Sequence, residues 1–307
     1  MQYPVAFWLG FHILIAILLV VDLGLLHRRN AVIKFKAACL LSGFWIALAL
    51  LFNVFIYFYF GSESALQFFT GYLIEKSLSV DNLFVFLTIF TYFSTPPSHQ
   101  YKILFWGILG ALVCRISLIL LGVNLIAHFH FLYYLFGVFL VVSAIKLLRA
   151  QASPKDPSQG MLFKTLRRFL PMARGETQGH FFVKRGGKWK ATSLVLTLAV
   201  IECTDLIFAL DSVPAIFAVT SDPFIIYTSN IFAILGLRSL HFVLGPSLQK
   251  LHYFKFGLAA ILVFVGGKML LADLVSISLP VCLGVIFAIL IATVLASLQF
   301  CRKRRRL

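Results

Sequence analysis

The residues of this chain that could do chemistry are acids placed inside apolar segments. One such segment carries Glu202, Asp205 and Asp211, and an earlier one carries Glu75 and Asp81. A charge at the centre of a bilayer costs about 2.5–3.5 kcal/mol on insertion scales, so these acids together oppose insertion by roughly 10 kcal/mol or more unless they are neutralised. A bound cation, bound protons or nearby basic side chains can each supply that neutralisation.

Side chains with neutral oxygen atoms stand close to these acids in the sequence. They are Ser79, Asn82, Thr204 and Ser212. Carboxylate, amide and hydroxyl oxygens suit hard ions such as Mg, Ca and Mn, whereas softer ions favour thiolates and imidazoles. The cysteines are scattered and form no CxxC pair, so we expect them to pack as small apolar residues. The pattern therefore predicts a site for a divalent cation with oxygen ligands.

Three bases also lie inside apolar segments, namely Lys76, Arg115 and Arg238. Three positive charges against five negative ones leave a formal charge of −2, which one divalent cation or two protons would cancel. An alternative is that the acids only pair with these bases and so hold helices together. For the two arginines this ion-pair role is the interpretation that we favour.

The spacing of the acids constrains how they can share one ion. Glu202 and Asp205 are three residues apart and therefore lie on one helix face. Asp205 and Asp211 are six residues apart, about 240° round an intact helix. Both can face one ion only if the helix breaks near them, and Pro214 is a residue that loosens a helix. We therefore expect a break in this segment.

The elements that must position these acids are membrane-spanning helices. The chain has 307 residues, of which 61% are hydrophobic and only 12% are charged, against about 25% charged in a typical soluble domain. Apolar runs of about 20 residues, long enough to cross a bilayer, recur along the chain. We predict an all-α polytopic membrane protein of about nine spans, at residues 5–26, 38–60, 66–93, 102–127, 130–149, 192–219, 224–245, 251–272 and 277–299.

The basic residues give this arrangement an orientation. The connections after odd-numbered spans carry Lys or Arg, and those after even-numbered spans do not. The positive-inside rule then predicts an outside N-terminus and a cytoplasmic C-terminus in the bacterial inner membrane. Most of the net charge of +16 comes from the loop around 146–190 and the tail at 302–306, so we expect these to face anionic lipid and not nucleic acid.

Two parts of the chain resemble each other in the same order, which indicates an internal repeat. The matching pairs are Glu75-x5-Asp81 with Asp205-x5-Asp211, Arg115-x6-Gly122 with Arg238-x6-Gly245, residues 131–137 with 251–257, and Lys146-Leu-Leu with Lys268-Met-Leu-Leu. Each copy would hold three spans, so the second enters the membrane from the opposite side. Inverted repeats of this kind are common in secondary transporters, which bind substrate near the bilayer midplane between the copies.

This repeat divides the chain into five predicted parts. They are a two-helix segment (1–65), repeat 1 (66–149), a basic cytoplasmic loop (150–191), the inverted repeat 2 (192–273), and a last helix with a basic tail (274–307). In the loop, residues 181–190 are typical of a hairpin turning at Gly186-Gly187, and residues 163–170 suit an amphipathic surface helix. A solvated basic linker is the alternative for this loop.

At its acidic motifs the chain resembles the TerC family of integral membrane proteins, above all its Alx-type members. The resemblance rests on Glu75-Lys-Ser-Leu-Ser-Val-Asp-Asn-Leu-Phe-Val-Phe, on Glu202-x-Thr-Asp-Leu-Ile-Phe-Ala-x-Asp-Ser-Val-Pro-Ala, and on Thr228-Ser-Asn-Ile-Phe-Ala-Ile-Leu-Gly-Leu-Arg238. The family is named for tellurium resistance, and its Alx-like members are linked to manganese export. The resemblance implies metal ligands at Glu75, Asp81, Asn82, Glu202, Asp205 and Asp211. Supporting residues would be Lys76, Ser79, Arg115, Thr204, Ser212 and Arg238.

Together these patterns predict a divalent-cation exporter, with manganese named by the resemblance, that works by alternating access. Protons or sodium would exchange for the metal at the carboxylates, without a permanently bound cofactor and without enzyme activity. Two rival interpretations remain open. Asp81 and Asp211 could form the dyad of an intramembrane aspartyl protease, which would leave three acids unexplained. A scaffold or stress-resistance protein without transport would not need the acids at all.

Overall fold

The computed structural model describes residues 4–27, 35–129, 131–149, 179–185, 187–244, 254–275 and 277–304, and they are mostly helical. The helices are α1 (Val5–His27), α2 (Phe35–Tyr92), α3 (Pro97–His128), α4 (Phe131–Arg149), α6 (Ser193–Phe217), α7 (Pro223–Leu235), α8 (Leu237–Leu244), α9 (Phe254–Leu270) and α10 (Leu279–Arg304). A short antiparallel pair, β1 (Phe182–Arg185) and β2 (Lys188–Ala191), precedes α6. This architecture confirms the predicted polytopic, helical class.

Each predicted span overlaps a helix in the described part of the chain. The long helix α2 overlaps two of them, 38–60 and 66–93. They are separated by a kink at Gly61, where the backbone leaves helical geometry with φ 88°. By length and apolar composition, six helical segments in the described part of the chain qualify as membrane spans, and one of them, Pro223–Leu244, combines α7 and α8. The count of nine spans therefore stays a prediction, as do the five-part division and the side on which each terminus lies.

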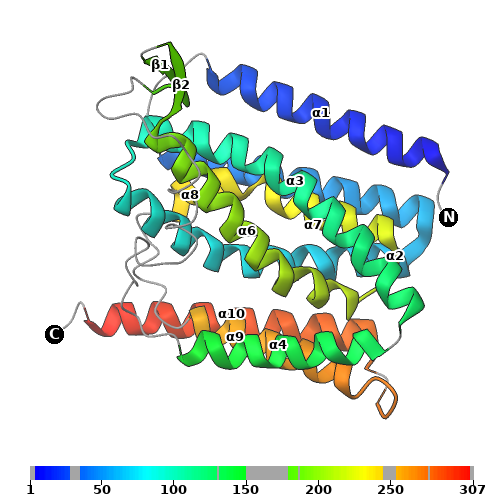
Figure 1. The fold of residues 1–307 in the computed structure, drawn as a ribbon. Coiled ribbons are helices and arrows are strands. Elements are labelled where there is room, and N and C mark those ends of the chain that lie inside the picture. The colour runs from blue at the N-terminus through cyan, green and yellow to red at the C-terminus, as the bar shows by residue number, and fades with distance from the viewer. Residues whose placement is uncertain are drawn as a thin grey trace.

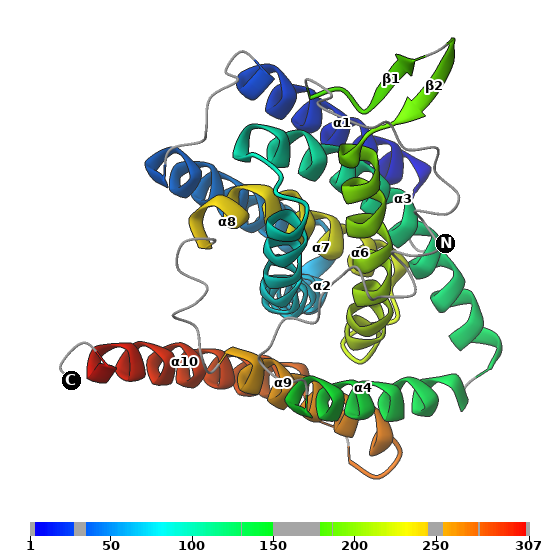
Figure 2. The same cartoon turned by 60° about the vertical axis from the view of Figure 1, so that its left-hand side comes forward.

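The helices form two groups that lie side by side. The larger group contains α1, α2, α3, α6, α7 and α8, whereas α4, α9 and α10 lie together along one side (Figures 1 and 2). Within these groups, α2 packs on α7 and α8, α3 packs on α6, and α4 packs on α9. Helix α6 also meets both α2 and α4, so it lies where the two groups join.

The outer surface of the bundle is apolar, as a lipid-facing surface must be. Leu40 and Phe58 are each 77% exposed, and many other large aliphatic and aromatic side chains point outward. The polar residues show the opposite pattern: Glu75, Arg115 and Asn230 are each 0% exposed. A protein that buries its charges and exposes its apolar side chains is adapted to a hydrocarbon surrounding.

The hairpin predicted at residues 181–190 is confirmed. Phe182 pairs with Ala191 and Arg185 with Lys188, which places the turn where the two glycines stand. Gly187 has φ +77°, a conformation that glycine adopts without the steric cost of a Cβ atom. The amphipathic helix predicted at 163–170 lies outside the described residues.

Helices α4 and α9 touch backbone to backbone at one pair of glycines. A Cβ atom added to Gly266 would lie 2.8 Å from the carbonyl oxygen of Gly137, and one added to Gly137 would lie 3.0 Å from that of Gly266. Small residues allow this close approach, which is how helices pack in a bilayer that offers no hydrophobic drive for association. The neighbouring Gly267 would meet nothing within 4 Å.

We therefore predict that Gly266→Ala destabilises the protein and that Gly267→Ala does not. The added methyl at 266 must push α9 away from α4, at a cost of about 1–3 kcal/mol for an overpacked contact. The same change at 267 has open space and gains up to about 1 kcal/mol of helix propensity. Thermal unfolding in detergent compares the two variants, and equal melting temperatures would show that the glycine contact does not hold α4 to α9.

Candidate ion-binding site

A fully buried arginine stands at the centre of the polar residues. Arg115 on α3 is 0% exposed and forms an ion pair with Glu75 on α2. Its guanidinium also donates hydrogen bonds to the hydroxyl of Ser212 on α6 at 3.2 Å and to Oδ1 of Asn230 on α7 at 3.0 Å. A longer contact of 3.5 Å reaches Asp205 on α6. One side chain therefore joins four helices, and we call this set the Arg115 cluster.

The Arg115 cluster satisfies both oxygens of its most deeply buried acid. Glu75 Oε1 accepts from Arg115, and Glu75 Oε2 accepts from Nδ2 of Asn230 at 3.1 Å. Arginine suits this role because its planar, permanently charged guanidinium donates in several directions at once. The ion-pair role predicted for Arg115 is confirmed. With one positive and two negative charges, Arg115, Glu75 and Asp205 carry a net charge of −1 when all are ionised.

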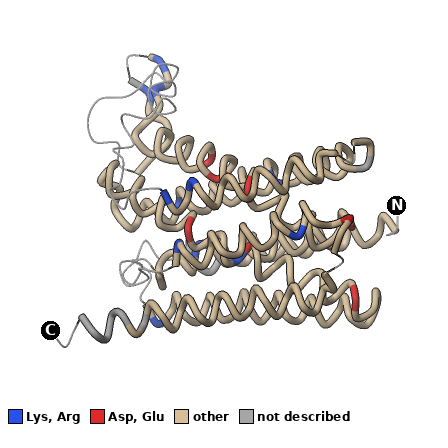
Figure 3. The backbone as a smooth tube through the Cα atoms, turned by 90° about the horizontal axis from the view of Figure 1, so that it is seen from below, with Lys and Arg blue, Asp and Glu red and all other residues tan. Residues whose placement is uncertain are grey.

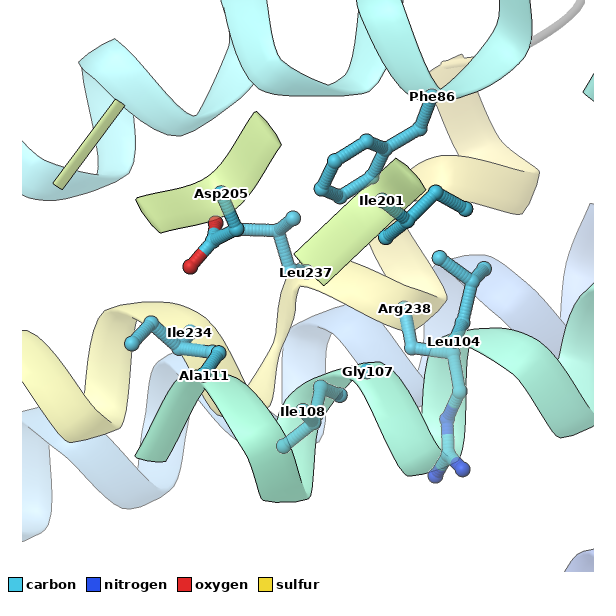
Figure 4. Close-up of a pocket in the computed structure, with 10 residues that line it drawn as sticks. All are labelled: Phe86, Leu104, Gly107, Ile108, Ala111, Ile201, Asp205, Ile234, Leu237 and Arg238. Atoms are coloured by element: carbon cyan, nitrogen blue, oxygen red, sulfur yellow. The ribbon is translucent and has the colours of Figure 1, made fainter. Parts of the chain in front are cut away.

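Asp205 has one oxygen turned away from this arrangement. Its Oδ2 atom is buried and has no hydrogen-bond partner in the described part of the chain. Asp205 lines a cavity of about 20 Å³ together with mostly apolar residues and Arg238, and Figure 4 shows the two charged side chains on either side of the apolar ones. Such a cavity has room for about one water molecule. Arg238 itself stacks over the ring of Tyr101, 4.4 Å from its centroid.

A second pair of acids lies apart from the Arg115 cluster. Asp81 on α2 and Asp211 on α6 are half-buried, and they lie close enough for their negative charges to repel each other. The hydroxyl of Ser143 on α4 donates to Asp211 at 2.7 Å. Lys146 on α4 lies near enough to attract the Asp211 carboxylate. Asp211 therefore connects the larger helix group to α4.

Glu202 occupies a third position, at the contact between α3 and α6. Its carboxylate lies against the helix face formed by Gly107 and Gly110, and a Cβ atom added to Gly110 would collide with it. A Cβ atom added to Gly107 would lie 3.6 Å from Glu202 Oε1, which is ordinary contact. The absence of a side chain at Gly110 therefore makes the space in which Glu202 lies.

The other predicted supporting residues have more local roles. Lys76 donates to the carbonyl oxygen of Ala233 on α7 at 3.1 Å, and Thr204 donates to the carbonyl of Val200 one turn earlier at 2.6 Å. Ser79 and Asn82 are buried on α2, and the Ser79 hydroxyl has no hydrogen-bond partner among the described residues. Figure 3 shows that charged residues lie partway along the helices and not only at their ends.

The helix break expected near Asp205 and Asp211 is not present, and that prediction was wrong. Helix α6 runs from Ser193 to Phe217 with Pro214 inside its last turn. The two aspartates therefore keep the angular separation of an intact helix, and they contact different neighbours: Arg115 for Asp205 and Ser143 for Asp211. Pro214 has no backbone N–H to donate to the carbonyl of residue 210, yet the helix continues through it to Phe217.

The six predicted ligands do not form one cluster in this arrangement. Within the ranges that the structure describes, no group of three or more His, Cys, Asp or Glu side chains is placed to hold a metal ion. The acids instead fall into the Glu75–Asp205 pair at Arg115, the Asp81–Asp211 pair, and Glu202. Sequence reasoning missed Asn230 and Ser143. Asn230 stands in the Thr228-Ser-Asn motif and could have been found there, whereas nothing in the sequence marks Ser143.

Comparison with known proteins gives a consistent result over most of the chain. The model of the integral membrane protein TerC family matches residues 60–306. A membrane protein of Myxococcus xanthus is 48% identical over 291 residues, which is 95% of this chain and 91% of that protein. A protein of Escherichia coli (strain K12) named putative membrane-bound redox modulator Alx is 45% identical over 295 residues, 93% of this chain and 92% of the relative. A membrane protein of Rickettsia bellii is 39% identical over 290 residues, 94% of this chain and 96% of that protein. No solved structure matches the chain.

The Arg115 cluster predicts a specific pattern of stability changes. Arg115→Met keeps much of the side-chain volume but leaves Glu75 and Asp205 without their shared cation, so we expect the free energy of unfolding to fall by about 3–5 kcal/mol. Adding Glu75→Gln to this variant removes one unpaired charge and should recover part of the loss. Thermal unfolding in detergent measures both effects.

The exposed Arg149 at the end of α4 provides the control, because Arg149→Met removes the same charge from a solvated position. We expect its melting temperature to equal that of the unmodified protein. A double variant no more stable than Arg115→Met alone would show that Arg115 does not act by neutralising Glu75.

Proposed function

Since this chain belongs to the integral membrane protein TerC family, we propose that it exports a divalent metal cation, manganese first among the candidates, by alternating access. The metal is the transported substrate and not a resident cofactor. Protons or sodium ions replace it at the carboxylates as the protein returns. The chain's own contribution is a set of buried acids from two helices, held in place by one buried arginine.

One observation supports this proposal above the others: corresponding acids of the two predicted repeats interact with each other or with the same partner. Glu75 in the first copy corresponds to Asp205 in the second, and these two share Arg115. Asp81 corresponds to Asp211, and these two lie within electrostatic range of each other. The helix contacts also relate the two copies. Helix α2, which carries the first span of copy one, packs on α7 and α8, the second span of copy two, and α6, the first span of copy two, packs on α3, the second span of copy one. The third helices, α4 and α9, pack on each other.

Such an arrangement suits a transporter because the two copies can exchange conformations. In inverted-repeat transporters, one repeat or bundle moves against the other around a site near the midplane. Asp211 lies at a boundary of this kind, since its α6 backbone belongs to the larger helix group and its hydrogen bond goes to Ser143 on α4. A movement of α4 relative to α6 would alter that contact and the surroundings of Asp81 with it.

Arg115 limits which carboxylates can hold a metal at a given time. Its guanidinium occupies the space between Glu75 and Asp205 that a metal bound by both acids would need. A cation can therefore reach these two acids only when the guanidinium moves, whereas Asp81, Asp211 and the amide of Asn82 are not held by it. The proposal assigns first contact with the metal to Asp81 and Asp211, whose like charges a divalent cation would bridge.

The redox role in the name of the Escherichia coli relative would require a redox-active group. Among the residues whose side chains the structure describes, Cys39, Cys114, Cys203 and Cys282 are free thiols. They form no CxxC motif, and although Cys114 and Cys203 lie within electrostatic range of each other, they are not joined by a disulfide. We therefore base the proposal on the carboxylates and not on the cysteines.

Metal uptake into everted membrane vesicles tests the proposal. We expect uptake of manganese by vesicles that contain the protein, with calcium, magnesium and zinc as competitors that rank its selectivity. Asp81→Asn and Asp211→Asn should each reduce uptake at least tenfold, because the neutral amide weakens the attraction for a divalent cation.

Glu63→Gln is the matched control, since it neutralises an exposed acid outside the proposed site. It should leave uptake unchanged at equal amounts of protein in the membrane. No uptake above empty vesicles, with or without an imposed proton or sodium gradient, would refute transport and favour a scaffold role.

The glycine face under Glu202 provides a further prediction. Gly110→Ala should raise the manganese concentration needed for half-maximal uptake, because the new methyl displaces the Glu202 carboxylate. Gly107→Ala, one turn away on the same face, places its methyl at ordinary contact distance and should leave that concentration unchanged. Equal values for the two variants would show that the position of Glu202 does not affect metal binding.

A further inference from the structure

The hairpin formed by β1 and β2 exposes aromatic and basic side chains together. Trp189 is 67% exposed and Phe182 is 54% exposed, although such residues are normally covered in a soluble domain. Lys184 stands directly opposite Trp189 in the antiparallel register, so Phe182, Lys184 and Trp189 share one face. Lys188, which lies next to Trp189 and on the other face of the hairpin, is exposed as well. No acid occurs between residues 179 and 192.

This hairpin is fixed to the membrane-spanning part of the protein. The backbone N–H of Thr192 donates to the carbonyl of Phe181 at 3.0 Å, and the Thr192 hydroxyl donates to the carbonyl of His180 at 2.8 Å. The same hydroxyl oxygen accepts from the backbone N–H of Leu194 and so caps the start of α6. One threonine therefore links the base of the hairpin to the first turn of the helix that carries Glu202, Asp205 and Asp211.

The hairpin lies at the side of the bundle and level with the helix ends. Figure 1 shows β1 and β2 at the upper left, beside the end of α1 that is farther from the N-terminus. Figure 3, seen from below, again shows it outside the helices and at the same end as the C-terminus. The ends of spanning helices mark the membrane surface, so this position corresponds to the layer of lipid headgroups beside the protein.

We propose that the hairpin docks onto the anionic headgroups of the surrounding bilayer. The aromatic rings of Trp189 and Phe182 suit the boundary between headgroups and hydrocarbon, where amphipathic and large apolar rings gather in membrane proteins. The lysines suit the anionic headgroups, to which juxtamembrane basic segments are attracted. Docking fixes the depth of the N-terminal end of α6 in the membrane. It does not depend on transport, and its test uses no transport assay.

The test measures how deep Trp189 lies in the bilayer. The full chain is placed in nanodiscs of phosphatidylcholine, alone or mixed with phosphatidylglycerol, and the lipid carries bromine either near the headgroup or near the chain end. Bromine quenches a nearby tryptophan, and the contribution of Trp189 is the difference between the unmodified protein and Trp189→Phe. We expect bromine near the headgroup to quench this contribution at least twofold in the anionic lipid, with little effect of bromine near the chain end.

Trp106 is the internal control, because it is 51% exposed on α3, nine residues inside the start of that helix at Pro97. The contribution of Trp106 to quenching, measured with Trp106→Phe, should rise with bromine near the chain end and should not change with phosphatidylglycerol. Quenching of Trp106 in each variant also shows that the variant is folded and inserted. Lys184→Glu combined with Lys188→Glu should abolish the effect of phosphatidylglycerol on Trp189. The proposal is overturned if neither bromine position quenches Trp189, or if its quenching is the same with and without the anionic lipid.

Discussion

The ion pair between Arg115 and Glu75 is the interaction on which the rest of the interior depends. Both groups are fully buried, and in a bundle surrounded by lipid neither can be left without a partner. Because Arg115 comes from α3, Glu75 from α2, Asp205 and Ser212 from α6 and Asn230 from α7, the contacts of one guanidinium join four helices at one point. Exposed apolar side chains such as Leu40 face the lipid. They do not determine which helices pack together, because lipid is as apolar as they are.

Helix continuity decides how the remaining acids are divided. In an unbroken α6, Asp205 and Asp211 face different directions, so one meets Arg115 and the other meets Ser143 on α4. Glu202, one turn before Asp205, is directed to the glycine face of α3. The close approach of α4 and α9 at Gly137 and Gly266 has a related effect, because it holds α4, and therefore Ser143, as part of a rigid pair.

Much of this arrangement follows from the sequence, and the missing part has a physical cause. The apolar runs locate the helices, two glycines in a basic loop locate the hairpin, and an arginine inside an apolar span of a chain whose other spans carry acids indicates an ion pair. The pattern could not show that α6 continues through Pro214, since a proline can either kink or end a helix and the surrounding packing decides which. Nor could it find Ser143, because a serine in an apolar helix becomes significant only when another helix brings an acid to it.

The separation of the acids also constrains any mechanism that uses all of them. One cation cannot contact Glu75 and Asp205 while Arg115 remains between them, so the metal and the guanidinium must exclude each other at that pair. Lys146 attracts Asp211 from α4, but within the described ranges no guanidinium pairs with Asp81 or Asp211, so their like charges leave this pair the more open place for an arriving ion. A metal bound there would cancel the repulsion between α2 and α6 and allow them to approach. Metal release, by the same reasoning, requires another positive charge at those carboxylates, which is the part that protons or sodium play in an exchanger.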